Sequence, residues 1–266
     1  MDLTSPAHVA ALVASAVGAG AMNAMAGGGT ILTFPTLIFL GMPAIAANAT
    51  STVALLPGAA ASLAGFRDDV LRYKAWLKTL FLPSLLGGIA GSVLLLRTPE
   101  KTFAHLAPVL ILLATVLFMA RGALARRFMP AGEGAGEPDP SRLSRGRWLA
   151  ATLLQLAVAV YGGYFGAGIG ILMLALLGFL GLQDIHAMNG LKNFFNLCIN
   201  CVAAGYFILR GAVTWPAALI LAVGAVLGGY GGARFSKHIG QEKARAAVVV
   251  IGLLVTALLA WQQLAK

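Results

Sequence analysis

Apolar stretches separated by short polar segments dominate the pattern of this sequence. Runs of about 20 apolar residues recur along the whole chain, and an α-helix needs this length to cross a bilayer. The pattern predicts an all-α polytopic membrane protein, because only helices and closed barrels satisfy every backbone hydrogen bond in lipid. The predicted apolar segments are Ala7–Ala26, Thr30–Leu40, Ala44–Phe66, Ala75–Leu96, Phe103–Ala120, Trp148–Phe165, Gly168–Leu180, Ile185–Leu209, Trp215–Ala233 and Ala244–Leu264.

A polar stretch, Arg121–Arg147, interrupts this pattern near the middle of the chain. It contains two Gly-Glu pairs, three prolines and six arginines, a composition typical of a solvated linker. We therefore predict a first transmembrane repeat at 1–120, a basic linker at 121–147 and a second transmembrane repeat at 148–266. The positive-inside rule predicts that the linker is cytoplasmic.

The two halves carry the same landmarks in the same order. Gly27–Leu32 corresponds to Ala167–Leu172 at an offset of 140 residues, and Glu100-Lys101 matches Glu242-Lys243 after two insertions. These landmarks predict two homologous halves.

The first apolar stretch, Ala7–Leu40, is too long for one span and is broken at Gly27–Gly29. If it folds back as a re-entrant hairpin, each half has a broken hairpin plus three transmembrane helices, and the halves are inverted repeats. If it crosses the membrane fully, the halves are parallel and Arg234–Arg245 lies outside. The positive-inside rule favours the inverted arrangement.

Composition narrows the class of protein further. The 266 residues are 59% hydrophobic and 11% charged, with a mean hydropathy of +0.86, which excludes an ordinary soluble domain. The net charge of +10 comes from basic residues that flank apolar runs, so we expect contact with lipid headgroups rather than nucleic acid. Cys198 and Cys201 are the only cysteines and are expected to be small core residues. No spacing of His, Cys and carboxylates suits a metal, and no cofactor is expected.

Lys192 is the residue that most directly suggests a function. It lies within the apolar stretch His186–Leu209, whereas all nine carboxylates of the chain lie in predicted loops or at segment ends. Burying a lone ammonium in hydrocarbon costs about 2.5–3.5 kcal/mol. A permeating anion would offset this cost. The alternative is that the side chain snorkels to a membrane interface.

Glycine-rich breaks occur at matching places in the two halves, at Gly27–Gly29 and at Gly166–Gly170. Short helices that restart there would aim their N-termini into the membrane, where backbone N–H groups attract anions. Matched broken helices are typical of transporter sites. Asn23, one turn before the first break, is expected to cap the cavity or to bond the broken backbone. The alternative role for the breaks is close helix packing.

Polar side chains follow each break. Asn48–Thr52 is the cluster in the first half, and Asn189–Asn193 is its counterpart in the second. Asn193, Asn196 and Asn200 share one helical face. Alternatively, hydroxyls bond back to their own helix and amides join helices. The predicted substrate-binding residues are Asn23, Gly27, Gly28, Gly29, Thr30, Thr50, Ser51, Thr52, Gly168, Gly170, Lys192, Asn193 and Asn196.

Several of these motifs also suggest a family. They are Gly20–Gly29 followed by Pro35, Gly41–Pro43, Ala47–Thr52, Gly163–Gly170 and Gly190–Asn193. With them, the chain resembles the sulfite exporter TauE/SafE family of membrane permeases. The resemblance implies two related halves and transport of sulfite, sulfoacetate or related sulfur-containing anions, driven by proton or charge gradients. It also implies that Asn23, Thr50, Ser51 and Lys192 are site residues.

These features predict a secondary transporter, a permease or exporter that moves a small sulfur-containing anion across the inner (cytoplasmic) membrane. The alternatives are an anion channel and a transporter of an unrelated small anion. A membrane-embedded enzyme is disfavoured because the apolar segments lack carboxylates, and no GxxxxGK[ST] loop indicates ATP binding. The expected partners are the small anion and the bilayer, without nucleic acid, and a homodimer is an alternative to a monomer.

Overall fold

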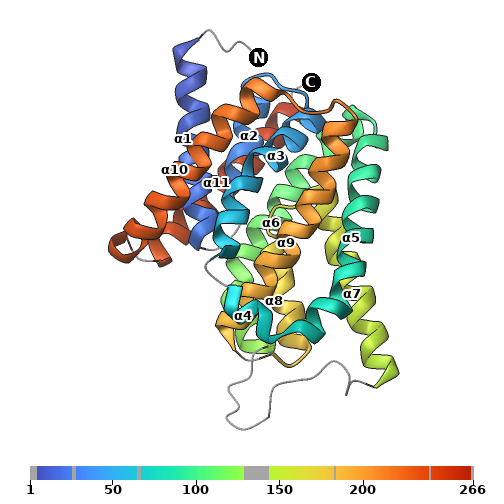
Figure 1. Ribbon diagram of the computed structural model, residues 1–266. Helices are drawn as coiled ribbons and strands as arrows, with labels where there is room; N and C mark the ends of the chain where they lie inside the picture. The colour runs from blue at the N-terminus through green and yellow to red at the C-terminus, as the bar shows by residue number, and fades with distance from the viewer. Residues whose placement is uncertain are drawn as a thin grey trace.

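The computed structural model describes residues 5–25, 28–64, 67–128, 144–182, 184–239 and 241–264. Most of these residues are helical, and none of them forms a strand (Figure 1). In chain order the helices are α1 (Pro6–Met25), α2 (Thr30–Phe39), α3 (Ala44–Ala64), α4 (Arg67–Arg72), α5 (Lys74–Arg97), α6 (Glu100–Phe128), α7 (Arg145–Tyr164), α8 (Ile169–Phe179), α9 (Ile185–Leu209), α10 (Trp215–Ile239) and α11 (Gln241–Leu264).

The described helices include four that are long and apolar enough to cross a membrane. The stretches concerned are Ala44–Ala61, Lys74–Arg97, Glu100–Ala120 and His186–Leu209. Shorter apolar stretches occur at Thr30–Phe39, Ile169–Phe179, Trp215–Gly229 and Val249–Trp261. The predicted all-α polytopic class is therefore confirmed.

Helices α2 and α8 are too short to cross the membrane by themselves. They have 10 and 11 residues, which corresponds to about 15–17 Å against a hydrocarbon core of about 30 Å. Each contacts the helix that precedes it, α2 on α1 and α8 on α7. Each half of the chain therefore begins with a helix pair joined at a break, as the sequence predicts.

Glycines in the left-handed region form both breaks. Gly28 has a φ of 101°, and Gly166 and Gly168 have φ values of 78° and 76°. Side chains are strained at these angles, whereas glycine adopts them readily. At Gly28 an added Cβ would also lie 2.5 Å from Cε2 of Phe118. Backbone geometry therefore explains why glycine stands at these positions.

The packing of the helices relates the two halves to each other. Helix α1 packs on α10 in the way that α7 packs on α5, and α3 contacts α10 as α9 contacts α5. Helix α3 also contacts α9, and α6 contacts α11. These contacts are therefore reproduced when α1, α2, α3, α5 and α6 are exchanged, in that order, for α7, α8, α9, α10 and α11. Helix α4 has no counterpart among the described helices.

Small residues allow two of these helix pairs to approach closely. A Cβ at Gly228 would overlap the carbonyl of Val17 in the α1–α10 pair. In the α5–α7 pair, a Cβ at Gly91 would overlap the carbonyl of Val160. Lipid supplies no hydrophobic driving force between helices, so this close backbone packing contributes much of the association. Gly91 and Gly228 are therefore packing residues.

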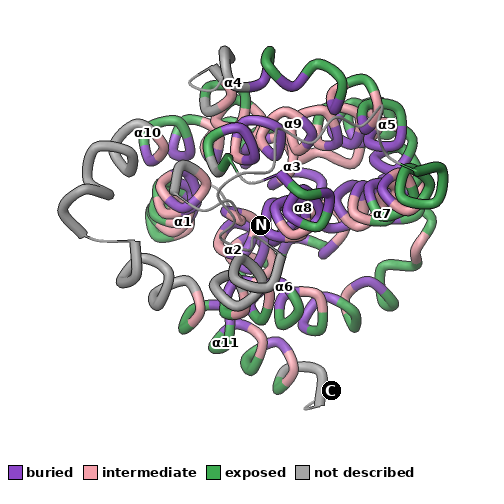
Figure 2. Tube along the Cα trace, turned by 90° about the horizontal axis from the view of Figure 1, so that it is seen from below, coloured by how far each residue is buried: buried purple, intermediate pink, exposed green. Residues whose placement is uncertain are grey.

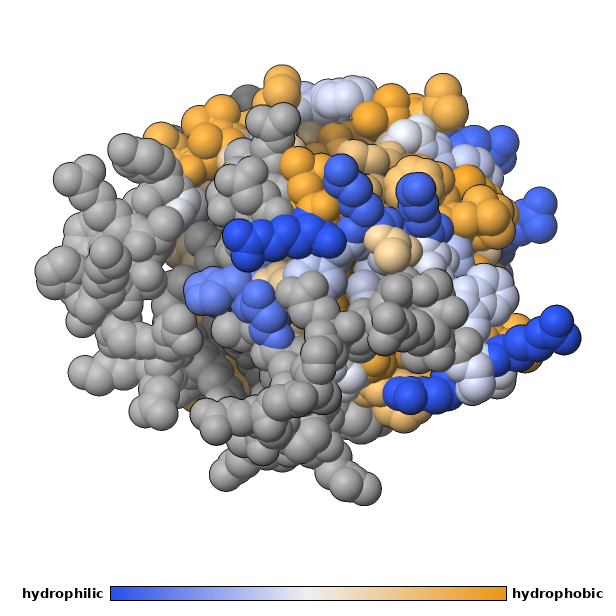
Figure 3. Space-filling model, turned by 60° about the horizontal axis from the view of Figure 1, so that its bottom comes forward, coloured by the Kyte–Doolittle hydropathy of each residue, from blue (hydrophilic) through white to orange (hydrophobic). Residues whose placement is uncertain are grey.

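Buried and exposed faces are arranged as in a bundle surrounded by lipid. Figure 2 shows buried residues gathered where α2, α3, α8 and α9 meet. Large apolar side chains are exposed on outer faces, for example Leu82, Val109 and Leu227, each at about 60% exposure. Hydrophilic side chains gather at the end of the bundle that faces the viewer in Figure 3.

Candidate functional site

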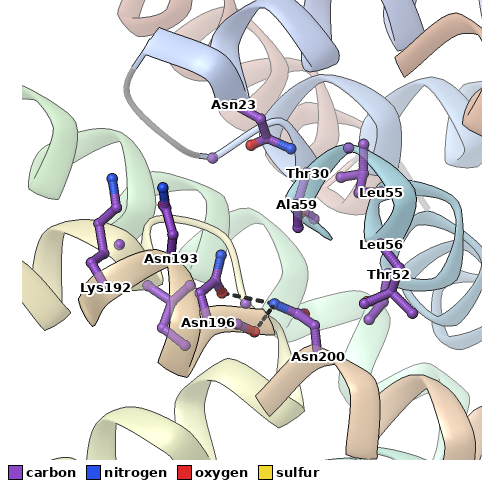
Figure 4. Close-up of a pocket in the computed structure, with 15 residues that line it drawn as sticks. Asn23, Thr30, Thr52, Leu55, Leu56, Ala59, Lys192, Asn193, Asn196 and Asn200 are labelled. Carbon is purple, nitrogen blue, oxygen red and sulfur yellow. Dashed lines mark hydrogen bonds between the residues drawn. The ribbon is translucent and has the colours of Figure 1, made fainter. Parts of the chain in front are cut away.

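A cavity of about 60 Å³ lies between the two helix breaks and the facing helices α3 and α9 (Figure 4). A single water needs about 10–15 Å³ of such space, so the cavity has room for about four to six groups of that size. The lining residues are Asn23, Gly28, Thr30, Thr52, Leu55, Leu56, Gly58, Ala59, Gly166, Ile169, Gly170, Lys192, Asn193, Asn196 and Asn200.

Lys192 brings a buried positive charge to this cavity. Only 8% of its surface is exposed, so most of the side chain is packed inside the protein. Its Nζ donates a hydrogen bond to Oδ1 of Asn189 at 3.0 Å. The alkyl stem runs along the first turn of α8, where a Cβ added to Gly170 would lie 3.3 Å from Cδ of Lys192. The absence of a side chain at Gly170 therefore allows the ammonium to lie beside the break.

The amides of α9 continue the polar wall from Lys192. Nδ2 of Asn200 donates to the backbone oxygen of Asn196 at 2.8 Å and to its Oδ1 at 2.7 Å. Because Oδ1 of Asn196 accepts this bond, its NH₂ group is the end that remains available to a ligand. Figure 4 shows the nitrogen ends of Lys192, Asn193 and Asn196 pointing the same way, toward the side where Asn23 lies. This wall consequently presents donors to the cavity.

Asn23 ties the first break together. Its Oδ1 accepts the backbone N–H of Gly29 at 2.7 Å, just before α2 begins. The first turn of a helix leaves N–H groups without intrahelical partners, and this bond satisfies one of them. Asn23 therefore bonds the broken backbone and also lines the cavity, so its amide nitrogen is available on the same side as Thr30.

The wall that faces the amides is mostly apolar. Leu55, Leu56 and Ala59 line it from α3. Thr52 also lies on α3, but its hydroxyl donates to the carbonyl of Asn48 one turn earlier, at 2.9 Å. The back-bonding alternative is thus correct for Thr52. The cavity is polar on one side and apolar on the other.

Other predicted residues have structural partners outside the cavity. Oγ1 of Thr50 accepts the backbone N–H of Thr214 at 3.0 Å, which joins α3 to the start of α10. The hydroxyl of Ser51 lies 2.6 Å from that of Thr33 on α2, and both side chains are fully buried. We interpret both contacts as ties between helices.

The predicted glycines also fall into two groups, those that line the cavity and those that do not. Gly28 and Gly170 line the cavity, whereas Gly29 and Gly168 are buried beside it and do not line it. Gly168 precedes α8 in the left-handed conformation and sets the direction of that helix. Gly27 lies outside the described residues.

Sequence reasoning did not assign the apolar wall to the site. Apolar residues of a membrane helix look the same in sequence whether they face lipid or a cavity. The available signal was the helical spacing from Thr52, because Leu55, Leu56 and Ala59 follow it by three, four and seven positions. Asn200 was recognised as a member of the amide row without being assigned to the site.

The cysteines differ from expectation. Cys198 is half-buried, but Cys201 is exposed on the outer face of α9, so the prediction of core cysteines is wrong for Cys201. Neither thiol lines the cavity. Within the described part of the chain, no three His, Cys, Asp or Glu side chains come close enough to hold a metal ion.

Comparison with known proteins identifies the family. The family model for the sulfite exporter TauE/SafE matches residues 12–259, which include every residue that lines the cavity in the described part of the chain. The chain belongs to the TauE/SafE family. Its family membership and its apolar helices make it a multi-pass membrane transporter.

Curated relatives are named as membrane transporters. A probable membrane transporter protein of Haemophilus influenzae is 28% identical over 91% of this chain and 90% of its own length. The probable membrane transporter protein ORF9 of a Sinorhizobium species is 26% identical, covering 92% of this chain and 89% of the relative. The probable membrane transporter protein YfcA of Escherichia coli K12 is 26% identical, covering 96% and 90%. No solved structure matches the chain.

Proposed function

We propose that this TauE/SafE protein is a secondary transporter that carries a small sulfur-containing anion, sulfite or an organosulfonate, through the cavity between the two breaks. The observation that carries the proposal is the burial of the Lys192 ammonium in that cavity. A charged side chain inside a span is costly and usually marks a substrate or ion pathway. A bound anion would stabilise it.

The surrounding groups support an anionic ligand. Asn193 and Asn196 present amide N–H donors beside the ammonium, and the N-terminal end of α8 lies at Gly170 on the same cavity. Donors of this kind suit the oxygens of an oxyanion, and helix N-termini favour negative charge. None of the cavity-lining residues in the described part of the chain is a carboxylate.

We further propose that the halves are inverted repeats with the 121–147 linker in the cytoplasm. The corresponding helix contacts of the two halves support two homologous units. Exposed basic residues support a cytoplasmic location for the starts of α5 and α7. These residues are Arg72, Lys74, Lys78, Arg145 and Arg147. The positive-inside rule assigns such clusters to the cytoplasm.

The lining of the cavity favours a carrier over a channel. An anion channel needs a continuous polar path, whereas Leu55, Leu56 and Ala59 of α3 line this cavity beside its polar groups. A transporter of an unrelated small anion is the alternative that the donors alone do not distinguish. The substrate range therefore has to be measured.

The test is transport by the purified protein in proteoliposomes. Solid-supported-membrane currents would be recorded for sulfite, thiosulfate, sulfate and short organosulfonates, with wild type and Lys192→Met. Lys78→Met is the matched control, because Lys78 is exposed near the start of α5. We expect a saturable current with sulfite or an organosulfonate that Lys192→Met abolishes and Lys78→Met retains. Equal currents from both variants would refute the site, and non-saturating currents would indicate a channel.

A further inference from the structure

Three phenylalanines from three different elements meet beside the cavity. Phe34 comes from α2, Phe103 from the first turn of α6 and Phe165 from the second break. Phe34 lies one helical turn beyond Thr30, which lines the cavity. Phe165 directly precedes Gly166, which lines it as well. The three rings therefore adjoin both helix breaks.

The course of α2 shows on which side of the cavity these rings lie. Helix α2 begins at the cavity with Thr30, and the short connection 40–43 joins its far end to the start of α3. Helix α6 begins at this same end of the bundle, because the carboxylate of Glu100 contacts the start of α3. Phe103 therefore reaches Phe34 from the end of the bundle, and a ligand leaving the cavity in this direction would meet the rings.

The rings are tightly packed against one another. The ring centroids are 5.3 Å apart for Phe34 and Phe165, 6.1 Å for Phe34 and Phe103, and 6.4 Å for Phe103 and Phe165. All three pairs have the edge-to-face geometry that aromatic side chains favour. Each of the three residues is at most 1% exposed. Packing of this kind leaves no space for water or an ion between the rings.

Glu100 ties this end of α6 to α3. Its carboxylate accepts the backbone N–H groups of Ala44 and Ile45, the first two residues of α3. Pro43, which precedes them, has no side-chain oxygen that could cap the helix. In the second half, by contrast, Asp184 caps α9 from the adjacent position in the chain. The start of α3 thus depends on a charge-assisted contact with another helix.

We infer that Phe34, Phe103 and Phe165 form a closed gate between the cavity and the end of the bundle at which α3 and α6 begin. Glu100 is a positioning residue that holds this gate shut. The inference rests on the proposed cavity as the transport site, but it concerns access to the cavity and not the ligand. Two of the rings belong to the first half and one to the second. A movement of the halves against each other, the usual basis of alternating access, would therefore separate them.

The experiment measures how fast a cysteine in the cavity reacts from one side of the membrane. Thr52→Cys is the reporter, introduced after Cys198 and Cys201 have been replaced, because Thr52 lines the cavity. A small, charged methanethiosulfonate reagent that does not cross membranes is applied to intact cells and to inside-out vesicles. The relevant side is the one from which Lys101→Cys reacts, because Lys101 directly follows Glu100.

We expect the reporter to react slowly from this side and about tenfold faster when Phe103→Ala is added. Phe103 takes part in three ring contacts, and even weak contacts of this kind together shift an equilibrium by about tenfold. Leu80→Ala is the control, because Leu80 is also fully buried but belongs to a separate cluster on α5. It should leave the rate unchanged.

Glu100→Gln tests the gate without removing buried volume. Loss of the charge weakens the hydrogen bonds to α3, so we expect labelling to become about fivefold faster. Adding Pro43→Asp to this variant supplies α3 with a local cap like Asp184, but it does not restore the tie to α6. The double variant should therefore regain melting temperature in detergent and still be labelled fast.

Four results would contradict the inference. Fast labelling of the reporter from this side without a further substitution, or an unchanged rate in Phe103→Ala, would show that no closed gate lies here. Equal acceleration by Leu80→Ala would show general loosening of the bundle. A return to the slow rate on adding Pro43→Asp would show that Glu100 acts only as a helix cap. Labelling needs no substrate, so these results do not depend on whether Lys192 binds an anion, which the transport currents decide separately.

Discussion

Nζ of Lys192 lies 3.0 Å from Oδ1 of Asn189, and the carboxamide that accepts this hydrogen bond is neutral. The two residues are three positions apart on α9, a spacing that brings side chains together on one helix face. A neutral acceptor orients the ammonium without cancelling its charge. Asn189 does not line the cavity itself, so we interpret it as a positioning residue for Lys192.

Asn189→Asp should weaken anion binding by at least about tenfold, because a carboxylate at this position forms an ion pair with the ammonium and competes with the ligand. Calorimetric titration with methanesulfonate measures the loss. The same titration at lower pH should recover part of the affinity as the new carboxylate is protonated, a recovery that a purely structural defect would not show. Unchanged affinity in Asn189→Asp would remove Asn189 from this role.

Gly170→Ala should weaken anion binding by a few-fold and leave the fold intact. The new methyl group would lie 3.3 Å from Cδ of Lys192, so the stem has to shift by a few tenths of an ångström. Gly170 lies within α8, where alanine is preferred over glycine by about 1 kcal/mol. We therefore expect weaker binding together with equal or higher thermal stability in detergent.

Gly205→Ala is the matched control for this prediction. It lies in α9, and an added Cβ there would meet no atom within 4 Å. Its stability should not fall and its affinity should not change. A loss of affinity in Gly205→Ala equal to that in Gly170→Ala would show that the effect does not act through the stem of Lys192.

Gly91→Ala and Gly228→Ala should each destabilise the protein strongly. Their methyl groups would overlap the carbonyls of Val160 and Val17, which are backbone atoms that cannot turn aside. Overpacking typically costs about 1–3 kcal/mol. A fall in melting temperature for both variants, with Gly205→Ala unchanged, would support the close α5–α7 and α1–α10 pairs. Wild-type melting in both would contradict that packing.

The fold and the site differ in how far the sequence could predict them. The helix breaks were predictable because glycine clusters interrupt apolar runs, and Lys192 was predictable because a charge stands out in an apolar span. Thr50 and Ser51 are predicted site residues because they belong to the polar cluster after the first break and because the family resemblance implies it, but their partners, Thr214 and Thr33, are distant in sequence. Long-range partners of this kind are visible only in the folded structure.

The inverted arrangement can be tested with two corresponding positions. Lys101 and Lys243 follow the matching glutamates of the two halves, so inverted halves should expose them on opposite sides of the membrane. Single cysteines at these positions, introduced after Cys198 and Cys201 have been replaced, would be labelled in intact cells with a membrane-impermeant maleimide. We expect the reagent to label Lys101→Cys and to label Lys243→Cys only after the cells are opened. Labelling of both from the same side would contradict the inverted arrangement.

Lys192→Arg should retain part of the function that Lys192→Met loses. Both substitutions remove the compact ammonium, but arginine keeps the positive charge and spreads it over a planar fork. The lysine stem already runs close to Gly170, where a Cβ would lie 3.3 Å away, so the wider guanidinium has to extend further into the cavity and take up ligand space. We therefore expect arginine to lower the affinity for ethanesulfonate more than that for sulfate, because the longer substituent needs the space.

Lys192→Met should bind neither anion while remaining folded, since it relieves the cost of a buried charge. Titration of both variants with both anions checks this order, and equal binding by wild type, Lys192→Arg and Lys192→Met would mean that the charge at position 192 does not contact the ligand.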